Sequence, residues 1–173
     1  YLIRGNHEFR YMNDHYGLKN ECFKRIKLSY LNNDSYGSQQ FYNKITESFR
    51  YLPICAILNN SIFCVHGGIS ALIKNREELM NIQFCFADYV QAEFLWNDPD
   101  YEISTFLKSP RGVGCLFGPK ALDDFLKKMN FDLVIRGHQN EMEGYKWSFG
   151  ENGRIITVFS SVDYCGYSND GAF

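Results

Sequence analysis

The sequence predicts a layered domain of the α/β or α+β class, because helical and strand-like segments alternate along it. Its 173 residues, with a mass of 20.2 kDa, suit one compact domain that buries its own core. Hydrophobic residues make up 45% and charged residues 22%, a balance that argues against a disordered chain. The net charge of -2 supplies no basic field, so we expect no nucleic-acid partner.

Three segments carry apolar residues at helical spacing, which predicts amphipathic helices. The second segment stops before Pro53, and the third opens at Pro119 and ends near Lys127 and Lys128, as helices should. The apolar positions are Leu18, Cys22, Phe23 and Ile26 in the first, Phe41, Ile45 and Phe49 in the second, and Leu122, Phe125, Leu126 and Met129 in the third.

Four short apolar runs predict strands, at residues 54–58, 62–65, 133–135 and 155–159. Asn59-Asn60 separates the first two runs and predicts a tight hairpin turn. Asn152-Gly153 predicts another turn, which leads into the last run.

The cysteine pattern and the lack of a long apolar stretch bear on the cellular compartment. No two cysteines form a C-x-x-C pair, and most lie in or beside apolar runs, so we expect buried, reduced thiols. No stretch has the apolar length of a membrane span, and there is no secretory signal. We therefore expect an intracellular protein, cytoplasmic or nuclear, without a membrane partner. The cysteines are Cys22, Cys55, Cys64, Cys85, Cys115 and Cys165.

Three of the four histidines follow a short apolar run and lie within two residues of a glycine. The stretches are Leu2-Ile3-Arg4-Gly5-Asn6-His7, Ile62-Phe63-Cys64-Val65-His66-Gly67 and Leu133-Val134-Ile135-Arg136-Gly137-His138. A strand that ends in a polar loop holds that loop rigidly. If three such strands lie side by side, Asn6, His7, His66 and His138 converge. His15 lacks this context, and we interpret it as a surface or capping residue.

Imidazole nitrogen and amide oxygen together suit Mn, Fe, Zn or Co. The absence of nearby cysteine argues against a closed structural zinc site. The simpler interpretation is that each histidine is a hydrogen-bonded polar group in a turn. The shared context of the three histidines favours the metal site.

Two further loops carry polar groups suited to an anion. In Ser109-Pro110-Arg111-Gly112 a rigid proline precedes an arginine, whose guanidinium binds phosphate in a bidentate manner. The last predicted strand is followed by Tyr164, which offers a hydroxyl donor. Each signal alone is weak, since surface arginines and tyrosines at the edge of a core are common.

Together these stretches resemble the phosphoprotein phosphatase family, the type 1, 2A and 2B serine/threonine protein phosphatases. The stretches match the order of that family's motifs from the first residues to the last. They are Gly5-Asn6-His7-Glu8, His66-Gly67-Gly68-Ile69-Ser70, Leu95-Trp96-Asn97-Asp98-Pro99, Ser109-Pro110-Arg111-Gly112 with Phe117-Gly118, Arg136-Gly137-His138-Gln139 with Glu143-Gly144-Tyr145, and Phe159-Ser160 through Tyr164-Cys165-Gly166. One such motif is weak evidence, but six in order make accident very improbable.

The resemblance implies a calcineurin-like metallophosphoesterase fold, a mixed β-sandwich flanked by helices. It implies hydrolysis of phosphoserine and phosphothreonine in proteins by water activated by two metal ions (Mn, Fe or Zn). Asn6, His66 and His138 would be ligands of one metal, and His7 the general acid for the leaving oxygen. Asn6 and Arg111 would hold the phosphate, with Tyr164 nearby. Phosphoprotein substrates and regulatory or targeting subunits are the implied partners.

This chain departs from the family pattern at several neighbours of the proposed ligands. Asn97 replaces Ser or Thr, Gly137 replaces Ala, and Ser161-Val162-Asp163 replaces A-P-N. The stretch around Met142 is closer to type 2A, whereas the stretch after Cys165 is closer to type 1. The subfamily and the substrate preference therefore stay open.

The resemblance covers only the later part of the family's catalytic domain. Family members carry G-D-x-H-G and G-D-x-x-D-R-G upstream, and no Gly-Asp dipeptide occurs in this sequence, which begins Tyr1-Leu2-Ile3-Arg4 without Met. We therefore expect residues 1–173 to be a C-terminal portion of that domain that holds one metal at most. We expect the isolated chain to be inactive.

Two other functions stay open. A truncated phosphatase acting as a non-catalytic binding module fits the missing upstream ligands. A metallophosphoesterase for small molecules, such as a dinucleoside-polyphosphate hydrolase, shares a motif like Gly5-Asn6-His7-Glu8. The arginine loop and the Tyr164-Cys165-Gly166 segment fit the protein phosphatases better.

Overall fold

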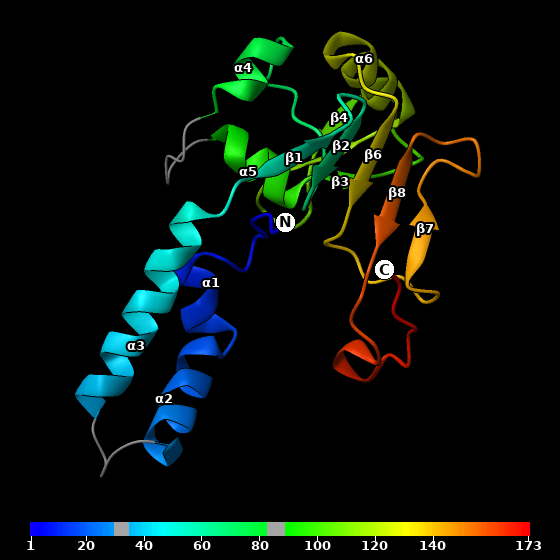
Figure 1. Cartoon of the computed structure of the whole chain (residues 1–173). Helices are drawn as coiled ribbons and strands as arrows, with labels where there is room; N and C mark the ends of the chain where they lie inside the picture. Colours follow the sequence, from blue (N-terminus) through cyan, green and yellow to red (C-terminus); the bar gives the residue numbers. More distant parts are fainter. Residues whose placement is uncertain (30–34, 83–88) are drawn as a thin grey trace.

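A computed structural model describes residues 1–29, 35–82 and 89–173. In order, the elements are α1 (Arg10–His15), α2 (Leu18–Ser29), α3 (Ser35–Ser48), the 3-10 turn η1 (Phe49–Tyr51), β1 (Cys55–Leu58), β2 (Ile62–Val65), α4 (Arg76–Met80), α5 (Tyr89–Trp96), β3 (Asp98–Pro99), β4 (Phe106–Lys108), β5 (Cys115–Phe117), α6 (Pro119–Met129), β6 (Leu133–Arg136), β7 (Tyr145–Trp147), β8 (Ile155–Val158) and the 3-10 turn η2 (Tyr164–Gly166). Helices α1 to α3 form a group beside the sheet region, whereas α4, α5 and α6 lie close to the strands (Figure 1).

The main sheet has five strands in the order β1-β2-β6-β8-β7. Strands β2, β6 and β8 run parallel, and the outer strands β1 and β7 pair antiparallel with their neighbours. Because β2 and β6 are parallel neighbours, His66 and His138 leave the same edge of the sheet. A smaller sheet has the order β3-β5-β4.

The core lies on one face of the main sheet. Phe63 is fully buried, and its ring lies 5.4–5.7 Å from the rings of Phe94, Phe125 and Phe131. Every second residue of β2 and β6 points the other way, and Ile62, Cys64, Leu133 and Ile135 on that face are only half-buried. The main sheet therefore has one tightly packed face and one apolar face that is partly accessible.

The predicted helices are confirmed as α2, α3 and α6. Helix α6 begins at Pro119, and its apolar stripe (Leu122, Phe125, Leu126, Met129) is buried. The predicted turn at Asn59-Asn60 is confirmed as well, since both residues have positive φ (48° and 58°), as a tight hairpin between twisted strands requires.

Other parts of the fold were missed or differ. Residues 1–5 form no strand: the backbone N–H of Arg4 bonds to the carbonyl of Pro53, but no strand ladder forms there among the described residues. Asn152-Gly153 lies within a longer connection between β7 and β8 rather than in a two-residue turn. Helix α5 was missed because it is buried on several sides, polar Gln91 and Glu93 included, and so lacks a periodic apolar stripe.

The five described cysteines are free thiols, but only Cys22 is fully buried. Cys55, Cys64 and Cys115 are half-buried and Cys165 is exposed, while Cys85 lies outside the described residues. Within the described residues, no helix has both the length and the apolar character of a membrane span.

Candidate active site

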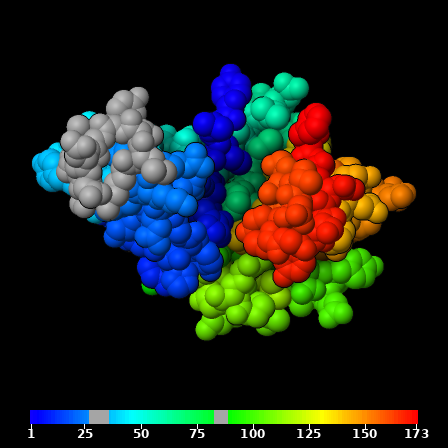
Figure 2. Space-filling model, turned by 90° about the horizontal axis from the view of Figure 1, so that it is seen from below, coloured from blue at the N-terminus to red at the C-terminus, as the bar shows by residue number. Residues whose placement is uncertain are grey.

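One cavity of about 550 Å³ is lined by all six residues singled out from the sequence: Asn6, His7, His66, Arg111, His138 and Tyr164. Met12, Tyr16, Trp96, Gln139, Asn140 and Phe159 complete its lining. Figure 2 shows the N-terminal residues (blue) and the C-terminal segment (orange to red) on the same face of the molecule. Segments far apart in the chain thus contribute to this cavity.

Three donor atoms meet at the centre of the cavity. His66 Nε2 lies 2.8 Å from Asn6 Oδ1 and 3.2 Å from His138 Nδ1. His66 and His138 come from the ends of the parallel strands β2 and β6, and the carbonyl of His66 accepts a 3.0 Å bond from Gly137 N–H. The sheet therefore fixes the spacing of the two rings.

This arrangement fits a metal ion. Two donors about 2.1 Å from one ion, at right angles, lie about 3.0 Å apart, close to the two observed separations. Burial and the nearby Arg136 lower the pKa of His66 to about 4, and burial and His66 lower that of His138 to about 2. Both imidazoles are therefore neutral at pH 7, the form that binds metals.

Asn6 and His7 lie on a short turn that is closed at both ends. The guanidinium of Arg4 donates to the carbonyl of Glu8 from Nε (3.2 Å) and Nη2 (2.8 Å). In return, the Glu8 carboxylate accepts a 2.7 Å bond from the N–H of Gly5. These bonds explain how Asn6 is presented to His66 without a regular strand beneath it.

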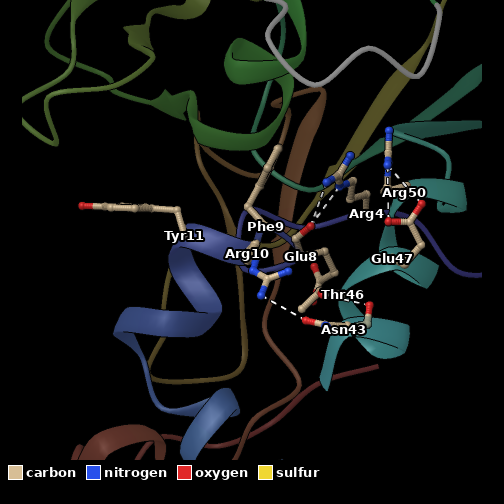
Figure 3. Close-up of a pocket in the computed structure, with 9 residues that line it drawn as sticks. All are labelled: Arg4, Glu8, Phe9, Arg10, Tyr11, Asn43, Thr46, Glu47 and Arg50. Carbon is tan, nitrogen blue, oxygen red and sulfur yellow. Dashed lines mark hydrogen bonds and ion pairs between the residues drawn. The ribbon is translucent and has the colours of Figure 1, made fainter. Parts of the chain in front are cut away.

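A second cavity, of about 490 Å³, adjoins this turn on the side of α3 (Figure 3). Its arginines bond to neighbours in the same wall: Arg10 to Asn43 at 3.0 Å and Arg50 to Glu47 at 3.0 Å. The Arg4 guanidinium also lies 4.1 Å above the Phe9 ring. The Arg10–Asn43 bond thus ties α1, which follows the Asn6–His7 turn, to α3.

His138 has a left-handed backbone, with φ of 69°. This conformation costs a residue other than glycine about 1–2 kcal/mol and is concentrated at functional sites. Nε2 of His138 is buried without a hydrogen-bond partner among the described residues. Its ring meets that of Trp96 edge-on, with the centroids 5.6 Å apart.

His7 and Arg111 lie at the exposed side of the cavity. The His7 ring lies 5.0 Å from that of Tyr16. Arg111 Nε donates to Asp98 Oδ2 at 2.7 Å, and the other Asp98 oxygen accepts a 2.7 Å bond from buried Arg136. The arginine of the cavity is thus held by a buried carboxylate.

Sequence reasoning missed Tyr16 and gave Asp98 no role. Tyr16 lies in the turn after α1, and no local pattern marks it as a cavity residue. Asp98 belongs to a stretch that was noticed, but its two arginine partners lie 13 and 38 residues away. The departures Asn97 and Gly137 are accommodated. Buried Asn97 bonds to the carbonyl of Ile69 and the N–H of Cys115, and a Cβ added at Gly137 would meet its nearest atom at 3.6 Å, an ordinary contact.

Known proteins resemble this chain in sequence. Residues 1–142 match the family described as calcineurin-like phosphoesterase. The chain is 40% identical over 167 residues to the serine/threonine-protein phosphatase 4 catalytic subunit of Saccharomyces cerevisiae, and 41% identical over 167 residues to that of Candida glabrata. Each match covers 95% of this chain and 50% of the relative, so the chain spans about half the length of these curated relatives.

A solved structure of similar fold is a protein serine/threonine phosphatase from Saccharomyces cerevisiae with similarity to human phosphatase PP5. The TM-score is 0.81 at 32% sequence identity. The match covers 98% of this chain and 50% of that one.

Proposed function

Because this chain belongs to the calcineurin-like phosphoesterase family, we propose that it supplies catalytic groups for the metal-dependent hydrolysis of phosphoserine and phosphothreonine in proteins. The observation that carries the proposal is that Asn6 Oδ1 and His138 Nδ1 both lie within 3.2 Å of His66 Nε2, in one cavity with His7 and Arg111.

Asn6, His66 and His138 would hold one metal ion (Mn, Fe or Zn). When bound, metal ions polarise the phosphoryl group and lower the pKa of a bound water. These donors are all neutral, and the described residues contain no group of three or more His, Cys, Asp or Glu arranged to hold a metal. We expect the isolated chain to bind one ion weakly, since no carboxylate balances its charge.

Arg111 binds the phosphate through its guanidinium and offsets the negative charge that builds up on the phosphoryl oxygens. Asp98 holds Nε of Arg111 and so orients that guanidinium. Asn6 and Tyr164 contact the phosphate from the other walls of the cavity. His7, on the exposed side, delivers the proton to the leaving serine or threonine oxygen.

An apolar groove beside this cavity favours a protein as the substrate rather than a dinucleotide. This groove, of about 870 Å³, shares Met12, Tyr16, Trp96 and Arg111 with the catalytic cavity. Its further lining includes Phe9, Tyr11, Tyr89 and Val113. Side chains that flank a phosphoserine would pack there.

Regulatory or targeting subunits, and a cytoplasmic or nuclear location, are parts of the same proposal.

The test begins with the endogenous protein, which is captured by antibody. Mass spectrometry gives its intact mass, and its activity is measured on a phosphoserine peptide with Mn²⁺. We expect hydrolysis of the peptide and none of a dinucleoside polyphosphate. Arg111→Ala should weaken phosphate binding and catalysis together, whereas His7→Ala should lower kcat by about 10²-fold or more with little change in KM.

Metal binding is measured separately on the isolated chain by calorimetry. His66→Gln should abolish Mn²⁺ binding, whereas His15→Gln, outside the cavity, should leave it unchanged. An endogenous protein of 20.2 kDa that releases no phosphate from the phosphoserine peptide would favour the binding module instead. We expect the isolated chain to be inactive. Turnover of the peptide by the isolated chain at about 1 s⁻¹ or faster, the range of typical enzymes, would contradict this expectation.

A further inference from the structure

The segment after β8 forms a loop that carries Tyr164 to the cavity and returns. Its ends are joined by the bond from Ala172 N–H to the carbonyl of Phe159 (3.0 Å). A second bond, from Asp170 N–H to the carbonyl of Met142 (2.8 Å), ties it to the preceding connection. In Figure 1 the loop extends beyond the end of β8, away from α6.

The backbone of this loop is unusual. Asp163, Cys165 and Ser168 have φ of 48°, 54° and 54°, and Gly166 has φ of 79°. Each left-handed residue other than glycine costs about 1–2 kcal/mol. Such a backbone persists only where surrounding bonds hold it.

Asn169 supplies those bonds from the inside of the loop. Its side chain is buried, with 1% of the residue exposed. Oδ1 accepts the N–H of Tyr164 at 2.8 Å, while Nδ2 donates to the carbonyls of Ser161 at 2.7 Å and Asp170 at 2.8 Å. Its own carbonyl accepts the N–H of Asp163 at 2.9 Å. One side chain thus links both arms of the loop to the backbone of Tyr164.

The ring of Tyr164 is placed by its backbone, by one aromatic neighbour and by a side-chain hydrogen bond with the adjacent Cys165. It meets the ring of Phe159 edge-on, with centroids 5.2 Å apart. Because 42% of the residue is exposed, packing restrains the ring only in part. We propose that Asn169 is a positioning residue, which holds Tyr164 at the wall of the catalytic cavity. The inference rests on the proposed function only for the task of Tyr164, which is to contact phosphate.

The test follows Tyr164 directly by ¹⁹F NMR of the chain labelled with 3-fluorotyrosine. The Tyr164 and Tyr16 resonances are assigned by their loss in Tyr164→Phe and Tyr16→Phe. Inorganic phosphate is the probe. In the wild-type chain we expect phosphate to shift both resonances, since both residues line the cavity.

In Asn169→Ala we expect the Tyr164 resonance to move towards its position in the urea-unfolded chain. Phosphate should then shift only Tyr16, with an affinity about tenfold lower, the equivalent of one lost hydrogen bond. Asn169→Asp keeps the oxygen that accepts the Tyr164 N–H and should restore much of the wild-type signal. If Asn169→Ala shows no cooperative melt, Asn169→Ser takes its place with the same expectation.

The matched control is Asn75→Ala, which removes an asparagine bond to the N–H of Glu78 at the start of α4. This variant should melt earlier than the wild type but leave the Tyr164 resonance unchanged. A Tyr164 resonance in Asn169→Ala at the wild-type position, with a wild-type response to phosphate, would overturn the inference. If phosphate shifts neither tyrosine in the wild type, the phosphate site of the proposed function fails, and the position of the Tyr164 resonance alone decides on Asn169.

Discussion

Asp98 bonds Arg111 at the candidate active-site cavity through one carboxylate oxygen and buried Arg136 through the other, each at 2.7 Å. The Arg136 side chain is fully buried and that of Asp98 nearly so, whereas 39% of the Arg111 side chain is exposed. Burial lowers the pKa of Arg136 to about 10, and Asp98 opposes that shift. Arg136 thus stays charged at neutral pH and depends on Asp98 for its counter-charge.

We predict that Asp98→Asn destabilises the chain by about 3–5 kcal/mol, the cost of leaving a buried charge without its partner. Urea denaturation at pH 7 measures this loss. The matched control is Asp123→Asn, because the pair of Asp123 with Arg154 is exposed and should contribute less than about 1 kcal/mol. Equal losses in the two variants would show that burial does not strengthen the dependence on Asp98.

Gly137, where the resembled family has alanine, is predicted to tolerate that alanine. A Cβ there would meet its nearest atom, the carbonyl oxygen of Val158, at an ordinary 3.6 Å. Gly137→Ala should therefore be neutral or stabilise by about 0.4–1 kcal/mol, through lower entropy of the unfolded chain.

Gly68→Ala is the contrasting variant. Its Cβ would overlap the ring of fully buried Phe117 and lie 2.9 Å from the carbonyl oxygen of Asn97. Thermal melts should show a loss of about 1–3 kcal/mol for Gly68→Ala. A larger loss for Gly137→Ala than for Gly68→Ala would refute this pair of predictions.

The hydroxyl of fully buried Tyr42 donates a 2.8 Å bond to Asp14 and so ties α3 to α1. Tyr42→Phe should cost about 1 kcal/mol at pH 7. Burial and the bond to Asp14 raise the pKa of Tyr42 to about 12, while an unfolded tyrosine titrates near 10. Between these values the folded state binds more protons, so the free energy of unfolding falls as pH rises.

The advantage of the wild type over Tyr42→Phe should accordingly shrink between pH 10 and 12. Urea denaturation of both proteins at pH 7, 10 and 11 measures the difference. Exposed Tyr51, changed to Phe, serves as the control and should give no pH-dependent difference from the wild type. A constant difference for Tyr42→Phe across this range would contradict the prediction.

Cys165 is predicted to be the first of the described thiols to react with iodoacetamide. It is exposed, whereas burial raises the pKa of Cys22, Cys64 and Cys115, and that of Cys55 to about 11. Thiolate is the reactive form, so the buried thiols should react slowly. Peptide mass mapping of a Cys85→Ser variant after short exposure should find the label at Cys165. Earlier labelling of Cys55 would show that the sheet opens readily.

The amino-acid sequence by itself determined the features that depend on near neighbours. The apolar stripe of α6, the paired asparagines before β2 and the glycines close to His7, His66 and His138 can each be read within a dozen residues. The six residues singled out from the sequence lie in five such loops, with Asn6 and His7 in the same one.

Only the tertiary structure decided which of these residues touch. Asn6 and His66 are 60 residues apart in the chain, yet Asn6 Oδ1 lies 2.8 Å from His66 Nε2. Residues 1–5 form no strand that would predict this contact. No local sequence pattern predicts the bonds of Asp98 to two arginines, or the hydrogen bond from the Tyr164 N–H to the Asn169 side chain. Such contacts form when strand pairing and core packing bring loops that are distant in the chain to the same edge of the sheet. The free energy that holds them in place comes from the packing of the whole fold, which no short stretch of sequence contains.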